Sequence, residues 1–335
     1  MLKTALTARL AIDHPIIQAG MAADCGVELA AAVSNAGALG TVGTIGRTPD
    51  GLEQELARMK EATSRPWSVN IVTFDWAPFA GSLLDLTIAA QPPSITLSFG
   101  DPLPALERCL AAGIPAIVQV QDFAAASAVL AAGPAAIVVQ GNEAGGHTGR
   151  RGTLSFAAQV LDQAGDVPVV VAGGVANGRG LAAALAMGAA GVLMGTRFKA
   201  THEFGGPSTG LLEEQRSSIV QSTGDNTVWD EITDIALGMQ WPRAIAGRVL
   251  ANRFTEKWLG HQEALRKEVA AQEQMFAWTA ANNSSPETVL NWAGESSGLV
   301  HQVLPAAEVV ARTAAEAEQL LRNASRVLEP VPASS

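Results

Sequence analysis

The sequence predicts an α/β fold, a (β/α)₈ or TIM barrel of parallel strands, with a C-terminal helical cap domain. Between Ile16 and Gly195, short β-branched runs alternate with stretches rich in alanine and leucine. Several of the runs are apolar at every position, which is typical of parallel strands buried on both faces. The chain has 335 residues, and a lone barrel needs roughly 250. The length therefore leaves room for an added lobe.

Eight runs are predicted to form the barrel strands. A large doubly wound sheet shows the same alternation of strands and helices, but the strand count and the chain length favour the closed barrel. The predicted strands are residues 16–20, 39–43, 67–71, 94–100, 115–120, 135–141, 167–174 and 191–195.

The stretches between the strands have the residue spacing of helices. Asp122 and Ser155 stand where helix N-caps belong. Glycines stand where helices should end, at Gly37, Gly113, Gly133 and Gly165.

The alternation stops after Gly195, and residues 205–299 are predicted to form helices and loops, for example in AIAGRVLANRFTEKWL. We expect this segment to be a cap and substrate domain over the barrel mouth; a helical side domain away from the chemistry is the alternative. The barrel would comprise residues 1–204 and a returning helix at about 300–325, with a frayed tail at 326–335. Five of the seven tryptophans lie in the expected cap: Trp229, Trp241, Trp258, Trp278 and Trp292.

Composition excludes several classes of protein. The net charge of −10 repels phosphate backbones, so we expect no nucleic-acid partner. No apolar run approaches the roughly 20 residues that a membrane span requires. Cys25 and Cys109 suggest neither a disulfide framework nor a metal site. The first residues lack the apolar core of a signal peptide, which favours a reduced, cytoplasmic protein.

Ligands of a parallel barrel bind at the C-terminal ends of its strands. AGG follows the seventh predicted strand and MGT the eighth, so Gly173, Gly174, Gly195 and Thr196 stand where bare backbone N–H groups can hold a phosphate. Other strands end in small or polar residues that we expect at the same mouth: Gly20, Met21, Asn70, Gln119 and Gln140.

The segment QGNEAGGHTG, residues 140–149, directly follows the sixth predicted strand. Gly145 and Gly146 leave room for a flat ligand against the backbone. His147 comes next, and a histidine at the rim can exchange a proton near neutral pH; a purely structural histidine is the alternative. Glu143 either orients His147 or caps the loop.

Two motifs are set aside. AGALGTVGTIG, residues 36–46, lacks the G-x-G-x-x-G fingerprint of dinucleotide sites. GESSG, residues 294–298, fits G-x-S-x-G, but a nucleophile elbow needs a preceding strand and a later acid and histidine. The segment before it looks helical and His301 follows too soon. The chain has no tyrosine, which removes Tyr as a general acid.

Several segments together resemble the nitronate monooxygenase family, once called 2-nitropropane dioxygenases. The resemblance runs over most of the chain and implies an FMN-dependent barrel with a helical cap. The matching segments are HPIIQAGMA (14–22), AAAVSNAGALGTVG (30–43), RPWSVNI (65–71), EAGGHTG (143–149), VVVAGGVANGRGLAAALAMGAAGVLMGTRF (169–198) and WAGESSG (292–298).

The resemblance also implies residue roles. His147 would be the catalytic base, and Met21, His147 and Ser296 would face the substrate. Gln119 stands where relatives often have Lys, and Glu295 where Gln is usual. The implied FMN-binding residues are Gly20, Met21, Asn70, Gln119, Gln140, Gly145, Gly146, Gly173, Gly174, Gly195 and Thr196.

The implied activity is oxidation of alkyl nitronates, or of nitroalkanes, with O₂ to a carbonyl compound and nitrite. An NAD(P)H:quinone reductase or an enoyl-acyl-carrier-protein reductase on the same FMN barrel is the first alternative. A non-catalytic flavin-binding protein and a flavin-free barrel acting on a sugar phosphate are the others. The sequence leaves a homodimer open.

Overall fold

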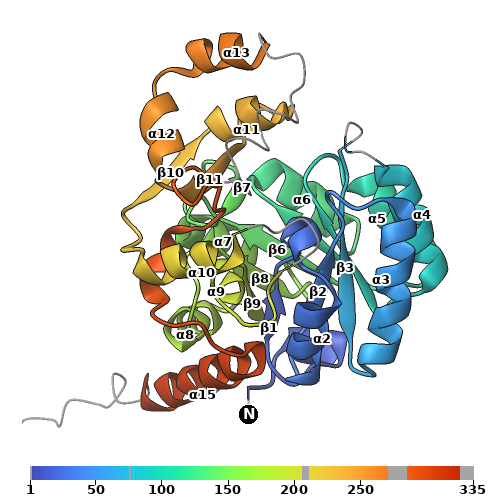
Figure 1. Cartoon of the computed structure of the whole chain (residues 1–335). Coiled ribbons are helices and arrows are strands. Elements are labelled where there is room, and N and C mark those ends of the chain that lie inside the picture. Colours follow the sequence, from blue (N-terminus) through green and yellow to red (C-terminus); the bar gives the residue numbers. More distant parts are fainter. Residues whose placement is uncertain (1, 75–76, 78, 206–210, 271–284, 325–335) are drawn as a thin grey trace, which may run out of the picture.

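The computed structural model describes residues 2–74, 77, 79–205, 211–270 and 285–324, and its centre is an eight-stranded parallel sheet (Figure 1). Trp278 and the predicted tail at 326–335 lie outside the described residues. The strands of the parallel sheet are β1 (Ile16–Gln18), β2 (Gly40–Gly43), β3 (Trp67–Val72), β4 (Ser94–Ser98), β5 (Ala116–Val120), β6 (Ala136–Gln140), β8 (Val169–Ala172) and β9 (Gly191–Met194).

Hydrogen bonds between the first two strands close the sheet into a barrel. Its order is β1-β9-β8-β6-β5-β4-β3-β2. The Gln18 N–H donates to the Leu39 carbonyl over 2.9 Å, and the Leu39 N–H donates to the Ile16 carbonyl over 3.0 Å. The eight predicted strands and the predicted barrel are confirmed.

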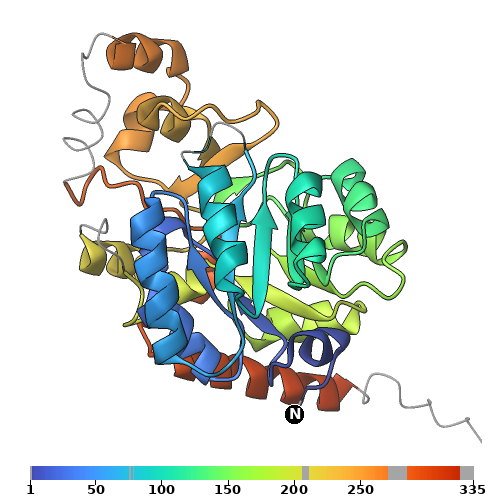
Figure 2. The same ribbon diagram turned by 90° about the vertical axis from the view of Figure 1, so that its right-hand side faces the viewer.

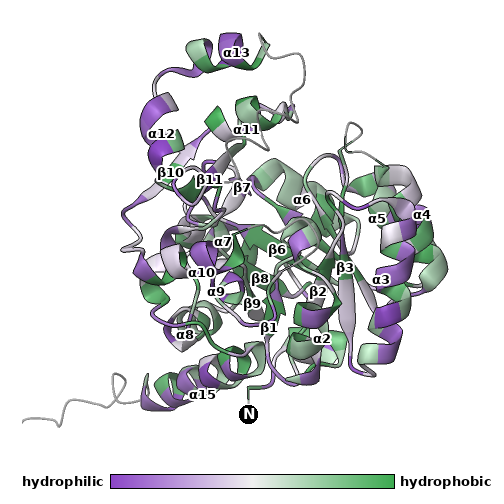
Figure 3. Cartoon of the chain, in the orientation of Figure 1, coloured by the Kyte–Doolittle hydropathy of each residue, from purple (hydrophilic) through white to green (hydrophobic). Residues whose placement is uncertain are grey.

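The helices surround the strands and turn apolar faces inward, while their outer faces carry most of the polar residues (Figure 3). Parallel neighbouring strands need a crossover connection, and helices provide it here. The barrel helices are α1 (Ala5–Leu10), the 3-10 turn η1 (Ala22–Asp24), α2 (Val27–Asn35), α3 (Pro49–Ala62), α4 (Ala80–Ala90), α5 (Leu103–Ala111), α6 (Phe123–Ala131), α7 (Thr153–Leu161), α8 (Gly178–Ala186) and α9 (Thr196–Lys199).

The helix boundaries confirm most of the local predictions. Asp122 is the N-cap of α6, where its side chain accepts the Ala125 N–H over 2.9 Å. Ser155 is not an N-cap, because α7 begins two residues earlier and the Glu143 carboxylate accepts the Thr153 N–H over 3.0 Å. An acceptor from a distant loop is invisible in local sequence. The glycines predicted beyond helix ends all have positive φ, namely Gly37, Gly113, Gly133 and Gly165.

The segment after the barrel contains strands that the sequence did not predict. It holds α10 (Leu212–Gln221), α11 (Ile232–Leu237), α12 (Arg253–Trp258), α13 (Gln262–Ala270) and the 3-10 turn η2 (Glu295–Leu299). It also holds β10 (Thr227–Asp230) and β11 (Ala246–Leu250), which form an antiparallel sheet with β7 (Gly146–Thr148) of the barrel loop. The helical prediction for residues 246–250 is therefore wrong. Pairing with an edge about a hundred residues away overrides the local spacing, which here resembled a helix.

The last helix returns to the base of the barrel. Helix α15 (Ala306–Ala324) shares one hydrophobic core with the barrel strands. Figure 2 shows α15 along the base, at the opposite end of the molecule from α12 and α13. Gly178 of α8 allows α8 and α15 to pack closely, because a Cβ at Gly178 would lie 2.5 Å from the Cβ of Glu316. Among the described residues, no helix has the length and apolar character to cross a membrane.

Candidate active site

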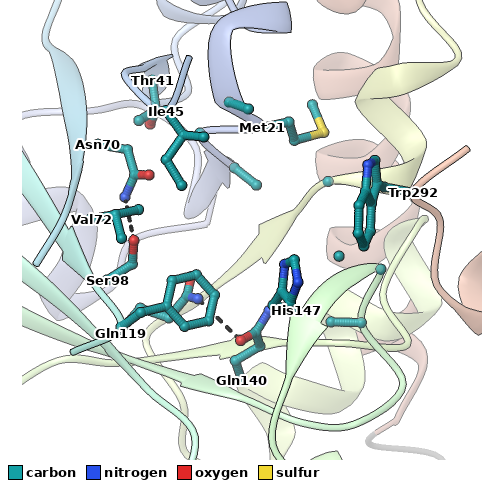
Figure 4. A pocket seen from close by; sticks show the side chains of 18 of the residues that line it. Met21, Thr41, Ile45, Asn70, Val72, Ser98, Gln119, Gln140, His147 and Trp292 are labelled. Atoms are coloured by element: carbon teal, nitrogen blue, oxygen red, sulfur yellow. Dashed lines mark hydrogen bonds between the residues drawn. The ribbon is translucent and has the colours of Figure 1, made fainter. Parts of the chain in front are cut away.

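A cavity of about 820 Å³ lies at the C-terminal ends of the barrel strands, with Trp292 and other residues of the 205–299 segment on one side (Figure 4). Every residue that the sequence assigned to a site lines it. The structure thus brings them together, while their individual roles stay predictions. They are Gly20, Met21, Asn70, Gln119, Gln140, Gly145, Gly146, His147, Gly173, Gly174, Gly195, Thr196 and Ser296.

His147 is held on several sides by the segment that follows the barrel. It lies in β7 and pairs with Gly247 of β11. Its ring stacks on Trp241 with 3.7 Å between centroids and 11° between planes, and the Trp292 ring lies at 5.0 Å. Its Nε2 is 2.6 Å from Oδ1 of Asp234. This imidazole is fixed in one orientation and largely shielded from water.

Asp234, the partner of His147, is a site residue that sequence reasoning missed. It lies on α11 and is buried. Burial raises the pKa of the Asp234 carboxyl, and the hydrogen bond with His147 opposes that rise. The Asp234 carboxylate, when ionised, can accept a hydrogen bond from Nε2–H of His147 and so hold the ring in one tautomer. No motif surrounds Asp234, and it lies 87 positions after His147, so no local signal could have found it.

Glu143 has a structural role, which decides the alternative that the sequence left open. Its carboxylate accepts the Thr153 N–H at the start of α7. Its other oxygen lies 2.3 Å from where a Cβ on Gly174 would be. Glu143 therefore caps the loop, and the residue that orients His147 is Asp234.

The two glycines before His147 differ in their surroundings. A Cβ on Gly145 would lie 2.5 Å from the Gly294 nitrogen, because the loop packs backbone to backbone against residues 293–294. Gly146 has φ +74 and nothing within 4 Å of its Cβ position. Gly145 is therefore needed for this close packing, while the Cβ position of Gly146 faces open space, and both glycines line the cavity.

We expect Gly145→Ala to lower the free energy of unfolding by roughly 1–3 kcal/mol, since an added methyl in close packing forces the backbone apart. Urea denaturation followed by tryptophan fluorescence measures this. Gly81→Ala is the matched control, because its Cβ position has nothing within 4 Å. Equal denaturation midpoints for the two variants would contradict the prediction.

The turns after β8 and β9 form a cradle of backbone N–H groups. Gly173 and Gly174 have φ of +104 and +74. Among the residues that the structure describes, neither N–H donates a hydrogen bond. Gly195 is the N-cap of the short helix α9, and the Thr196 hydroxyl accepts the Gly294 N–H over 3.0 Å. Unpaired N–H groups that line a cavity are typical of a phosphate site.

Neutral amides line the wall between the cradle and β3. Gln119 and Gln121 both donate to Oε1 of Gln140, over 3.1 and 3.0 Å. Asn70 donates to the Ser98 hydroxyl over 3.0 Å. The hydroxyl oxygen of Thr41, which also lines the cavity, is buried with no partner among the described residues. A wall of amides and hydroxyls can hydrogen-bond the heteroatoms of a ring without adding charge.

Lys199 is a second cavity residue that sequence reasoning missed. It is buried, and its Nζ donates to Oδ1 of Asn291 over 2.8 Å. Burial lowers the pKa of Lys199 to about 8. It lies at the end of α9, beside the proposed phosphate cradle.

Ser296 lines the cavity without the surroundings of a hydrolytic nucleophile. It lies in η2, and residues 285–294 before it are turn and loop with a single bridge from Trp292 to Val249. The helix expected before GESSG is therefore absent from the described residues 285–294. A nucleophile elbow needs a strand that leads into a helix, and neither flanks Ser296.

A family model described as nitronate monooxygenase matches residues 3–80 and 79–316. The chain belongs to the nitronate monooxygenase family. A Staphylococcus saprophyticus protein named probable nitronate monooxygenase is 31% identical over 90% of this chain and 94% of its own length. A Rhodococcus jostii protein is 41% identical over an aligned region that covers 60% of this chain and 56% of the Rhodococcus protein. That protein is named (3aS,4S,5R,7aS)-5-hydroxy-7a-methyl-1-oxo-octahydro-1H-indene-4-carboxyl-CoA dehydrogenase.

Two solved structures resemble this member of the family over nearly its whole length. FabK from Thermotoga maritima has a TM-score of 0.84 and 28% identity, covering 98% of this chain and 100% of that one. Nitroalkane oxidase from Streptomyces ansochromogenes has a TM-score of 0.78 and 28% identity, covering 96% and 100%. This chain is accordingly an oxidoreductase, and FMN is the cofactor of its family. The N–H cradle and the amide wall fit that cofactor.

Proposed function

We propose that this protein oxidises alkyl nitronates, and nitroalkanes after loss of their α-proton, with O₂ to a carbonyl compound and nitrite. The observation that carries the proposal is the His147–Asp234 pair at the mouth of the FMN cavity, 2.6 Å apart and stacked on Trp241. The relative named probable nitronate monooxygenase and the structural similarity to a nitroalkane oxidase support it.

The residues near β8 and β9 would hold the cofactor. The N–H groups of Gly173 and Gly174 would bind the FMN phosphate, together with Gly195 and Thr196. Asn70, Gln119 and Gln140 would hydrogen-bond the ring, with Gly20, Met21, Gly145 and Gly146 in contact with it. Bound FMN would supply the electron-transfer chemistry between the substrate anion and O₂.

The chain itself would supply the proton chemistry. With Asp234 ionised, Nε2–H of His147 donates to the carboxylate, and Nδ1 is left as the base for the α-proton. Asp234 then stabilises the imidazolium that forms. Trp241 stacks on one face of the imidazole and Trp292 lies beside the ring at a tilt, and both would limit access of water. General-base catalysis of this kind contributes roughly 10²–10⁴-fold.

Residues 205–299 would act as the cap and substrate domain. They provide Asp234, Trp241 and Trp292, which surround the proposed base His147, and Ser296, which lines the cavity. The barrel, with the returning helix, would provide the cofactor site. On this proposal, neither the barrel nor residues 205–299 alone would hold both the cofactor and the residues that position the base.

A reductase that uses NAD(P)H is the second candidate function, favoured by the similarity to FabK over 98% of the chain. One sample separates the two. The purified protein should show a flavin absorbance spectrum, should release nitrite from the nitronate of 1-nitrobutane with O₂, and should bleach only slowly with NADH under argon. Rapid bleaching by NADH without nitrite release would favour the reductase. A colourless protein that regains no activity with added FMN would contradict both the nitronate oxidation and the reductase function.

A further inference from the structure

The cavity extends to a second end, opposite the phosphate cradle. In the closed strand order, β4 lies three strands from β8, and β3 lies three strands from β9 in the other direction around the barrel. A ligand anchored at Gly173 and Gly174 therefore points across the barrel mouth toward the ends of β3 and β4. Figure 4 shows Val72 and Ile45 on the Asn70 side of the cavity, with His147 and Trp292 facing them from the other side.

Apolar side chains from the barrel and from the following segment meet at this second end, which we call the β3–β4 subsite. The Trp241 ring lies edge-on to Phe99 with 4.8 Å between centroids, and edge-on to Phe74 at 5.1 Å. The same Trp241 ring stacks on His147, so the subsite begins beside the proposed base. Its lining residues are Val72, Ala80, Leu83, Phe99, Met239 and Trp241.

The β3–β4 subsite has no charged side chain among its described residues. Apart from His147, the charged side chains that line the whole cavity in the described part of the chain are Asp24 and Lys199. Both follow β1 or β9, on the cradle side, and Lys199 is bonded to Asn291. Gln119, on β5, is an amide bonded to Gln140 and adds no cation. A carboxylate in this subsite would lose water without gaining a partner, which is costly.

The geometry points to a subsite for the uncharged hydrocarbon part of the substrate. Building on the proposed function, the substrate's nitro carbon lies at His147 and its alkyl chain or ring lies between Phe99, Leu83 and Trp241. The enzyme is therefore selective for neutral, apolar nitro compounds and against substrates with a carboxylate a few bonds from the nitro group.

Turnover of matched substrates tests this selectivity. The nitronate of 3-methyl-1-nitrobutane and propionate 3-nitronate have the same shape, because an isopropyl group replaces the carboxylate. We expect kcat/KM to be on the order of a hundredfold higher for the isopropyl compound. Along the linear series from ethyl to hexyl nitronate, kcat/KM should rise roughly fourfold per methylene. Equal values for the isosteres, or a higher value for the carboxylate, would overturn the inference.

A charge placed on the wall should reverse the preference. Met239 is half-buried, so Met239→Lys can be accommodated, and it should raise kcat/KM for propionate 3-nitronate at least tenfold while lowering that for hexyl nitronate. Ala80→Lys does the same from the barrel side if the first variant is unstable. Leu259→Lys is the matched control, since Leu259 is exposed and lies outside the cavity. An unchanged preference in both cavity variants counts against the subsite.

A binding experiment keeps this inference separate from the nitronate reaction. The FMN-loaded enzyme is titrated with 6-methylheptanamide and with adipamate, its carboxylate isostere, and the flavin absorbance is followed. Tighter binding of the neutral amide supports the apolar subsite even if no nitro compound is oxidised, which would reject only the proposed reaction. Tighter or equal binding of adipamate rejects the subsite whatever the enzyme oxidises.

Discussion

Replacing His147 with alanine is expected to lower kcat/KM for neutral nitroalkanes by about 10²–10⁴-fold, because the reaction then has no positioned base for the α-proton. The preformed nitronate has already lost that proton, so its oxidation should fall far less. Nitrite release from 1-nitrobutane and from its nitronate, measured on the same preparation, gives both values. FMN content should stay near one per chain, since His147 is not part of the phosphate cradle.

Two further variants make the result interpretable. His147→Ala leaves the buried Asp234 carboxylate without its partner, which can destabilise the fold. His147→Gln keeps an N–H near Asp234 and removes the base, so it should show the same loss on nitroalkanes. His261→Ala changes an exposed histidine of the same segment and should have no effect. Nitroalkane turnover that survives in both His147 variants, with FMN bound, means that another group takes the proton.

Asp234→Asn is expected to lower kcat/KM for nitroalkanes roughly a hundredfold, within the wide range found when an orienting carboxylate is replaced. The amide is close in shape to the carboxylate and can still hydrogen-bond Nε2 of His147, but it carries no negative charge to stabilise the imidazolium. Oxidation of the preformed nitronate should change little. Burial raises the pKa of the Asp234 carboxyl, so the fall in nitroalkane turnover that its protonation causes as the pH drops should be absent from Asp234→Asn, which a purely structural role would not cause.

Asp230→Asn is the control for the Asp234 variant. Asp230 lies at the end of β10, where its carboxylate accepts the Ile232 N–H and hydrogen bonds from Gln262, and it does not contact His147. Unfolding by urea should give similar midpoints for the two variants. Equal losses of nitroalkane and nitronate turnover in Asp234→Asn would show that Asp234 supports only the fold, and our assignment of a positioning role would fail.

Local pattern was sufficient for the barrel and for much of the cavity. The runs that become β6 and β8 are buried at every position, and β5 is buried at every position but Gln119, so each is recognisable without knowing its neighbours. The barrel rule then places the strand ends together, which brought Asn70, Gln140 and Gly174 into one site from sequence alone.

Local pattern was not sufficient where a residue depends on a distant partner. Ala246–Leu250 resembled a helix and forms a strand, because β7 and β10 provide its hydrogen bonds. Ser155 resembled an N-cap, but Glu143 from the loop before α7 caps that helix. Glycine is required at position 145 because the backbone there contacts Gly294, which lies 149 positions later in the sequence.

The amino-acid sequence by itself determined the parallel barrel, the glycine turns after β8 and β9, and the place of His147 at the mouth. Those features follow from burial and backbone freedom, which act over a few residues. Only the tertiary structure decided what surrounds the imidazole: Asp234, Trp241 and Trp292. Hydrogen bonds and ring contacts between distant segments depend on how the chain folds back on itself. The local spacing of residues does not predict them.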